Sequence, residues 1–272
     1  MSSAIRNLVL LLMLAAPAVC WAVPALRVCA DPNDLPYSNQ QQQGFENQLA
    51  KMIASDLGMQ VTYFWYPQRG RFFEKTLDAG VCDVVMGVPA GMEEAVSTRP
   101  YYISTYAFVS RRDRHLHITS LDDPRLKTLR IGVHILGESD DNVPPVRALV
   151  RRGIVHNLVG YSIFGHLDQT NPSANLVKAV ADNDVDIAVV WGPLAGYFAQ
   201  KSAVPLDVTP IAATSSDPAM SYSIGIGVRP QDGQLRQTLD AELQRREPEI
   251  RKLLASYGIP QVRPTSPVEG GN

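Results

Sequence analysis

The chain has 272 residues, of which 45% are hydrophobic and 19% are charged, and its formal net charge is −2. This length and composition allow one large core or two modest ones, and they argue against disordered and fibrous proteins. The basic residues are scattered and form no stripe, so the positively charged surface of a nucleic-acid-binding protein is not indicated.

The first 22 residues have the pattern of a cleaved secretory signal. Arg6 precedes an apolar stretch from Leu8 to Ala16, and small residues follow as far as Ala22. The stretch is too short to span a bilayer, and no other run approaches the required length. We therefore expect residues 1–22 to be removed and the mature protein to be exported.

Residues 26–91 show the pattern of a β-α-β-α-β unit. LRVCAD predicts a strand from Leu26, and GFENQLAKMIASDLG predicts a helix with one apolar face that ends at Gly58. VTYFWYP follows as a strand that Pro67 ends, RFFEKTLDAGV as a short helix that ends at Gly80, and CDVVMGVPAG as a strand. This unit builds parallel sheets covered by helices.

The segment STYAFVSRR, residues 104–112, is a predicted crossover into a second lobe. There LRIGVH predicts a strand, SANLVKAVADN a helix, and VDIAVVW a strand that ends at Trp191. SYSIGIGV, residues 221–228, is the second predicted crossover. Two C-terminal helices follow, because Pro248 fits the first turn of a new helix, and we expect them to pack on the first lobe.

An internal repeat supports two related lobes. Asp83 follows Leu26, and Asp186 follows Leu129, at the same interval of 57 residues, and each later strand is predicted to end in a Gly/Pro-rich loop. We assign residues 23–110 and 222–260 to the first lobe and residues 111–221 to the second. Residues 261–272, rich in Pro and Gly, are a predicted flexible tail.

Two cysteines, Cys29 and Cys82, follow the predicted signal, and an even pair in an oxidising compartment predicts a disulfide. Two buried free thiols are the alternative, because neighbouring strands can hold the sulfurs too far apart for a bond. The sequence has no CxxC motif and no Cys/His cluster, and His115 and His117 lack further ligands, so we assign no metal.

Candidate binding residues follow from the fold, because ligands of open α/β sheets bind beyond the carboxyl ends of the strands. The candidates are Asp31, Tyr37, Trp65, Tyr66, Arg69, Pro89, Glu93 and Tyr102 in the first lobe and His134, Asn142 and Trp191 in the second.

Each candidate also has a structural alternative. Trp191 and the tyrosines can stack on a ligand, anchor a partner or fill the core. Asp31 and Glu93 can bind a cation or a basic partner, or cap helices and face solvent. Arg69 can contact an anion or form a solvated surface, and His134 can titrate in the cleft or stay neutral and hydrogen-bonded.

Three segments resemble the periplasmic solute-binding proteins of the amino-acid type, family 3. GFENQLA is similar to the GFDIDLA helix of that family, TLDAGVCDVVMG to its segment before the first ligand loop, and PYY to its FSxPY. The resemblance covers residues 26–257 and implies an α/β, two-lobed periplasmic-binding-protein type II fold. In this fold each lobe is a mostly parallel sheet flanked by helices.

Two departures argue against an amino-acid ligand. These receptors clamp the substrate carboxylate with an arginine just past a strand end, where PAGMEEAVSTRPYY offers Met92, Glu93 and Glu94. The second lobe of such receptors supplies an aspartate for the ligand amine, and Trp191 takes that place here.

A closer resemblance is to the proteins encoded beside quinoprotein methanol dehydrogenases, the MxaJ/XoxJ group. Six segments carry it in the same order: CADPNDLPYSN, YPQRGRFF, CDVVMGVP, PYYISTYAFVSR, SLDDPRL and VVWGPLAGYFA. The basic block departs from the group, because Gly70 separates Arg69 from Arg71. The resemblance implies a periplasmic accessory protein that supports the activity or maturation of a PQQ-dependent methanol or alcohol dehydrogenase, with no cofactor of its own.

We therefore expect the cleft to bind a hydrophobic segment of the dehydrogenase or a small uncharged ligand. A receptor that delivers a non-amino-acid solute to an importer is the alternative. A dehydratase-type enzyme on the same fold is less favoured, because the chain has no G-x-S-x-G, HExxH or phosphate-binding glycine motif. The adjacent Glu93 and Glu94 also do not both point at one substrate atom.

Overall fold

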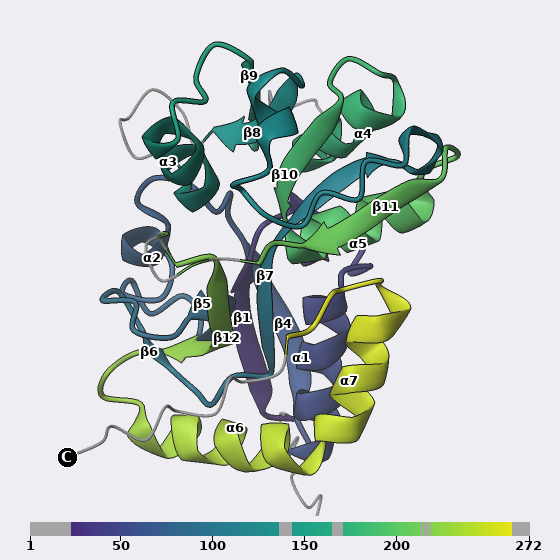
Figure 1. Ribbon diagram of the computed structural model, residues 1–272. Coiled ribbons are helices and arrows are strands. Elements are labelled where there is room, and N and C mark those ends of the chain that lie inside the picture. The colour runs from purple at the N-terminus through teal and green to yellow at the C-terminus, as the bar shows by residue number, and fades with distance from the viewer. Residues whose placement is uncertain are drawn as a thin grey trace, which may run out of the picture.

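A computed structural model describes residues 23–135, 143–164, 171–212, 214, 217 and 219–262. The predicted signal peptide, Asn142 and all but the first two residues of the predicted tail lie outside these residues. Figure 1 shows two groups of strands and helices, one above the other, joined through β7 (Tyr102–Arg111) and β12 (Ser221–Val228). We call the lower group the first lobe and the upper group the second lobe.

The first lobe contains β1 (Ala25–Ala30), β2 (Asn33–Asp34), β3 (Ser38–Asn39), α1 (Phe45–Asp56), β4 (Gln60–Trp65), α2 (Phe72–Lys75), β5 (Val84–Pro89), β6 (Val96–Ser97), α6 (Gly233–Arg245) and α7 (Glu247–Ser256). The second lobe contains β8 (Ile131–Ile135), α3 (Pro144–Arg151), β9 (Leu158–Ser162), α4 (Asn175–Ala181), β10 (Ile187–Trp191), α5 (Gly192–Lys201) and β11 (Leu206–Pro210). Short 3₁₀ turns lie at Arg112–Arg114, Pro124–Lys127 and Pro172–Ala174.

In each lobe the strands that alternate with helices pair in parallel, whereas β7 and β12 pair antiparallel with their neighbours. In the first lobe β1 pairs in parallel with β4 and β5. In the second lobe β8 pairs in parallel with β9 and β10. The predicted two-lobed α/β fold is therefore confirmed, and the carboxyl ends of these strands face the junction of the lobes.

The strand β7 belongs to the sheets of both lobes. Its residues 102–105 pair with β12, and its residues 106–110 pair with β10, so the strand order runs β4-β1-β5-β12-β7-β10-β8-β9. The boundary predicted between the first and second lobes, after residue 110, thus lies near the end of this shared strand. The assignment of every residue to a lobe stays a prediction.

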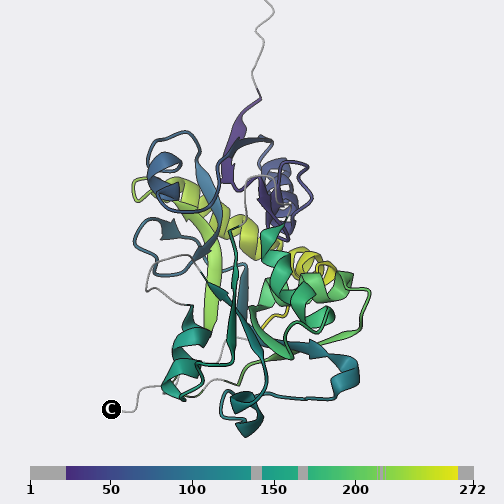
Figure 2. The same cartoon turned by 90° about the horizontal axis from the view of Figure 1, so that it is seen from above.

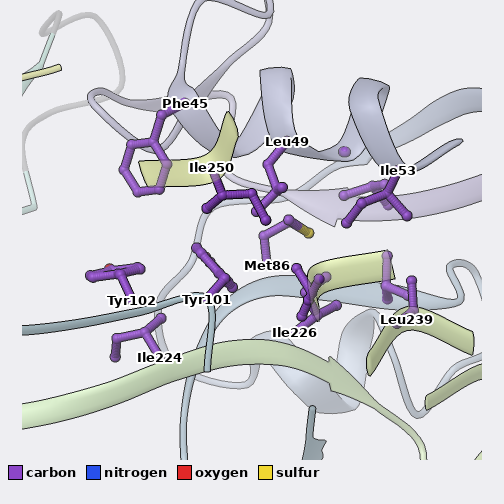
Figure 3. Close-up of a cluster of buried hydrophobic side chains, with 14 of the residues drawn as sticks. Phe45, Leu49, Ile53, Met86, Tyr101, Tyr102, Ile224, Ile226, Leu239 and Ile250 are labelled. Atoms are coloured by element: carbon purple, nitrogen blue, oxygen red, sulfur yellow. The ribbon is translucent and has the colours of Figure 1, made fainter. Parts of the chain in front are cut away.

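The core of the first lobe lies between α1, the sheet and the C-terminal helices. Phe45, Leu49 and Ile53 of α1 are fully buried, and in Figure 3 they lie on the side of α1 that faces Tyr102, Met86 and Leu239. The two C-terminal helices thus pack on the first lobe, as expected. They also approach the second lobe, because α7 lies beside α5 in both views (Figures 1 and 2), and Tyr257, just after α7, stacks on Tyr197 of α5 with ring centroids 5.8 Å apart.

One feature differs from the sequence-based expectation at Trp191. The Gly/Pro loop expected after this strand is a helix instead, because α5 begins directly at Gly192 with Pro193 in its first turn. Proline suits the first turn of a helix, where its missing N–H would have no partner. The glycine at position 196 in this helix lets the chain at Gly258 pack closely, since a Cβ at Gly196 would lie 1.8 Å from the carbonyl oxygen of Gly258.

The internal repeat has a physical basis in two matching side-chain clamps. Arg27 donates through its backbone N–H and its guanidinium to Asp83, and Arg130 does the same to Asp186. Each guanidinium also donates to a backbone carbonyl three residues before the aspartate. Asp83 immediately precedes β5, and Asp186 immediately precedes β10. Each aspartate therefore connects the start of its own strand to the neighbouring strand, β1 or β8.

The structure contains a disulfide between Cys29 and Cys82, whose Cα atoms are 5.6 Å apart. Cys29 lies opposite Val85 in the β1–β5 pair, and Cys82 comes two residues before β5. The two Cα atoms are within bonding reach because the chain enters β5 directly beside the end of β1.

Candidate functional site

A cavity of about 600 Å³ lies between the two lobes. Side chains at or just beyond the ends of β1, β5, β8 and β10 line it, as expected for a sheet of this kind. Its described lining residues include the aromatic side chains Tyr37, Tyr102, Tyr106, Phe164, Trp191 and Tyr222 and the polar side chains Asp31, Asn33, Asp34, Glu46, Gln68, Arg69, His134 and Ser173.

The cavity brings together most of the candidate residues that the sequence singled out. Asp31, Tyr37, Arg69, Pro89, Tyr102, His134 and Trp191 line it. Three further candidates lie elsewhere: Trp65 stacks on Tyr63, Tyr66 packs near Phe72, and Glu93 is exposed in the loop after β5. Asn142 lies outside the described residues. A binding role for each of these four residues stays a prediction.

Trp191 closes β10 and connects the two lobes. Its indole packs against hydrophobic clusters of both lobes and is only partly buried. The rings of Tyr106 and Tyr222 meet it edge to face, with centroids 5.2 and 5.8 Å away. This arrangement forms an aromatic wall, in which edge-to-face contacts hold each ring in place.

A buried carboxyl group, that of Glu46, lies at the first-lobe side of the cavity. The side chain is 6% exposed, and the Tyr101 hydroxyl donates to its Oε1 at 2.9 Å. Burial raises the pKa of Glu46 to about 7, although the Tyr101 hydrogen bond acts in the opposite direction. Gly87 makes room for this carboxyl because it has no Cβ, and a Cβ there would lie 2.7 Å from Glu46 Oε1.

Two aspartates in the loop after β1 have different environments. Both carboxylate oxygens of Asp31 accept backbone N–H groups, from Asn33 at 2.8 Å and from Gln68 at 2.6 Å. Asp34 lines the cavity as Asp31 does, and burial together with the negative charges of Asp31 and Glu46 raises its pKa well above the ordinary value. Asp31 thus shapes the loop, whereas Asp34 presents its carboxyl group to the cavity.

The same loop forms a direct contact between the lobes. Asn33 Oδ1 accepts the backbone N–H of Asn171 at 3.1 Å. Asn171 precedes the short turn that carries Ser173 into the cavity wall. The hydrogen bond therefore closes part of the cavity on one side.

On the second-lobe side, His134 is almost fully buried at 4% exposure. Burial lowers its pKa to about 4, so the imidazole is neutral at neutral pH. Its Nε2 has no hydrogen-bond partner among the described residues, and neither has the Oγ of the buried Ser173. Two uncharged polar groups therefore lie unpaired in this wall.

The charges of the cavity do not match an α-amino acid. Arg69, on the loop after β4, is the cationic side chain among the described lining residues; it is exposed and makes no ion pair with them. The described lining residues of the second lobe carry no carboxylate. The receptor pattern of an arginine clamp in one lobe and an aspartate in the other is thus missing from the described part of the cavity.

Sequence reasoning missed several of the cavity residues named above, among them Asp34, Glu46, Tyr106, Ser173 and Tyr222. A glutamate in the first turn of a helix is ordinarily a partner of the helix dipole on the surface, so the pattern of α1 did not mark Glu46. Tyr106 and Tyr222 lie inside predicted crossover strands. Crossover strands run between the lobes and therefore border the cleft. Their tyrosines could have been named as candidates on this ground.

Within the described residues, no group of three or more His, Cys, Asp or Glu side chains could hold a metal ion. The described helices are also all too short or too polar to cross a membrane.

Three known proteins are similar to this chain over most of its length. Protein MoxJ of Methylorubrum extorquens is 29% identical over 252 residues, which cover 89% of this chain and 82% of that protein. The crystal structure of MxaJ from Methlophaga aminisulfidivorans MPT is 29% identical, has a TM-score of 0.75 and matches 87% of this chain and 100% of that chain. The periplasmic binding protein XoxJ from Methylobacterium extorquens AM1 is 28% identical, with a TM-score of 0.71 and coverage of 88% and 99%.

Residues 26–258 match the family described as bacterial extracellular solute-binding proteins, family 3. The match covers both lobes and all strands that line the cavity. The chain belongs to this family, and within it the chain resembles MoxJ, MxaJ and XoxJ over both lobes.

Proposed function

We propose that this chain is a periplasmic, non-catalytic accessory protein that supports the activity or maturation of a PQQ-dependent methanol or alcohol dehydrogenase. Its similarity to MoxJ, MxaJ and XoxJ extends over both lobes, and XoxJ is itself described as a periplasmic binding protein. This similarity supports a role beside a quinoprotein dehydrogenase.

The observation that carries the proposal is the mismatch between the cavity and an amino acid. A ligand carboxylate would meet Asp34 and Glu46 inside the cavity, with Arg69 exposed on a loop. Like charges at close range are repulsive, and in a partly dry cavity water screens them poorly. The fold of an amino-acid receptor is therefore retained without the charge arrangement that such a receptor uses.

Native mass spectrometry of the mature chain with the quinoprotein dehydrogenase of its own organism tests the proposal. The dehydrogenase is presented in its apo form and loaded with PQQ, and an amino-acid receptor of family 3 is the control. We expect a complex with this chain, favouring the apo enzyme, and none with the control. The absence of a complex with either form would contradict the proposal.

An importer receptor is the second candidate, because a cavity of about 600 Å³ between two lobes has the size of a small-molecule site. The two functions differ in the partner. A receptor would bind the membrane subunit of an importer and stimulate uptake of a solute, whereas the accessory protein would bind the dehydrogenase.

A further inference from the structure

The cavity contains two carboxyl groups that lack a cationic partner. The buried Glu46 has one hydrogen-bond donor, the hydroxyl of Tyr101. Asp34 lines the cavity, and its carboxyl group forms no hydrogen bond or ion pair with the described residues. Glu46 is buried and Asp34 is half-buried, and a carboxyl group that loses its hydration ordinarily pairs with a cation or takes up a proton. These two groups therefore point to a positive charge that the chain itself does not supply.

The charges around these groups strengthen the negative potential. Asp31 lies close enough to Asp34 to act on its pKa, and Glu46 acts on it in the same direction. The pKa of Asp34 and that of Glu46 are raised mainly by burial, and the main causes include no basic side chain. Arg69 nevertheless lines the same cavity. The first-lobe side of the cavity thus favours a cation.

The walls around these carboxyl groups are aromatic. Tyr37, Tyr102, Tyr106, Trp191 and Tyr222 all line the cavity, and the contacts of Trp191 with Tyr106 and Tyr222 fix three of these rings. The faces of aromatic rings attract organic cations, most strongly for tryptophan and most strongly where water is excluded. Carboxyl groups and aromatic faces in one cavity suit an ammonium group with apolar substituents.

The opposite wall indicates the rest of the ligand. His134 Nε2 and Ser173 Oγ are buried and unpartnered in the described structure, and both residues line the cavity. Because the imidazole is neutral and has an unpaired ring nitrogen, this wall suits a hydroxyl or N–H group and offers no counter-ion for a carboxylate.

We propose that the cavity binds a small organic ammonium ion that carries a hydroxyl or N–H group and no carboxylate. The inference rests on the proposed function only in treating the chain as a binding protein. It replaces the uncharged ligand expected from the sequence, because the sequence did not mark Asp34 or Glu46 as cavity residues.

Isothermal titration calorimetry with matched probes tests the charge. Choline is the cationic probe, 3,3-dimethyl-1-butanol is its uncharged isostere, and glycine betaine carries the same ammonium group with a carboxylate. We expect choline to bind about tenfold or more tightly than either of the other two, as an aromatic site with desolvated carboxylates predicts. Equal affinity for choline and the isostere would overturn the inference, as would equal affinity for betaine or no binding of choline.

Variants then locate the site. Glu46→Gln keeps an acceptor for Tyr101 and removes the charge, and Asp34→Asn removes the second charge. Each is expected to weaken choline binding about tenfold, while Asp78→Asn, which changes an exposed carboxylate that does not line the cavity, leaves it unchanged. Unchanged affinity in both cavity variants would contradict the inference.

Two controls distinguish loss of folding from loss of choline binding. Thermal melts show whether each variant folds, and the comparison of the three probes on the wild-type chain needs no variant. Complex formation with the dehydrogenase is measured without any probe, so failure of choline to bind and failure of the complex to form are distinct results.

Discussion

At the residue scale, burial in the cavity wall changes the pH at which the Glu46 carboxyl loses its proton. Its ordinary pKa is 4.5, and burial raises this pKa to about 7 in the folded chain. Between these two pH values the folded chain holds a proton that the unfolded chain has lost. Folding stability therefore falls as pH rises from 4.5 through 7 and stays lower above that range.

The variant Glu46→Gln should remove this pH dependence, because glutamine does not titrate. At pH 5 the free energies of unfolding of the two proteins should be similar. At pH 8 the variant should be more stable by up to about 3 kcal/mol, the value that the change in pKa implies. Urea unfolding at both pH values measures the difference. A difference that is the same at pH 5 and pH 8 would show that Glu46 titrates normally in the folded chain.

Some cavity residues were predictable from sequence and others were not. Trp191 lies at the carboxyl end of β10, the end that marks the binding edge of such sheets, and Tyr102 is the first residue of the crossover strand β7. Asp34 follows an irregular loop, and its exposure to the cavity depends on how β2, β3 and the second lobe close over it. That closure is a tertiary contact, which local sequence patterns do not encode.

At the element scale, the helices and strands with strong periodicity were predictable and the shorter ones were not. The helix at GFENQLAKMIASDLG and the strand SYSIGIGV lie where the pattern puts them, at Phe45–Asp56 and Ser221–Val228. The strand β9 is short and carries no clear alternation, and α5 starts with Gly192 and Pro193, which serve loops as readily as first helical turns.

The helix α5 provides a test of close packing between elements. Gly196→Ala would place a Cβ 1.8 Å from the backbone oxygen of Gly258, so α5 or the segment after α7 must move. We expect a loss of about 1–3 kcal/mol in unfolding free energy. Gly233→Ala at the start of α6 is the matched control, because a Cβ there meets nothing within 4 Å. Thermal melts compare the two, and equal melting temperatures would contradict the packing described for α5.

At the scale of the whole molecule, two lobes with separate cores are joined by shared strands and by contacts across the cavity. The strand β7 pairs with both lobes, Trp191 packs against a cluster in each, and Asn33 bonds to Asn171. The cavity is therefore bounded by both lobes. A ligand that pairs with Glu46 while contacting His134 would add to the contacts that hold the lobes together.

The disulfide is expected to stabilise the first lobe. Cys29 and Cys82 are 53 residues apart in sequence, and a bond that closes a loop of this length contributes about 3–4 kcal/mol by restricting the unfolded chain. The mature protein should contain no thiol that reacts with Ellman's reagent before unfolding or after it. Cys82→Ser should lower the melting temperature, and the appearance of two reactive thiols in the unfolded wild-type protein would contradict the bond.

The most direct test of the proposed role is the recovery of dehydrogenase activity. The apo dehydrogenase of the same organism is supplied with PQQ and its metal, and alcohol oxidation is followed by dye reduction with and without the mature chain. We predict a faster or larger recovery of activity at equimolar chain. A time course that is identical with and without the chain would contradict the proposed accessory role.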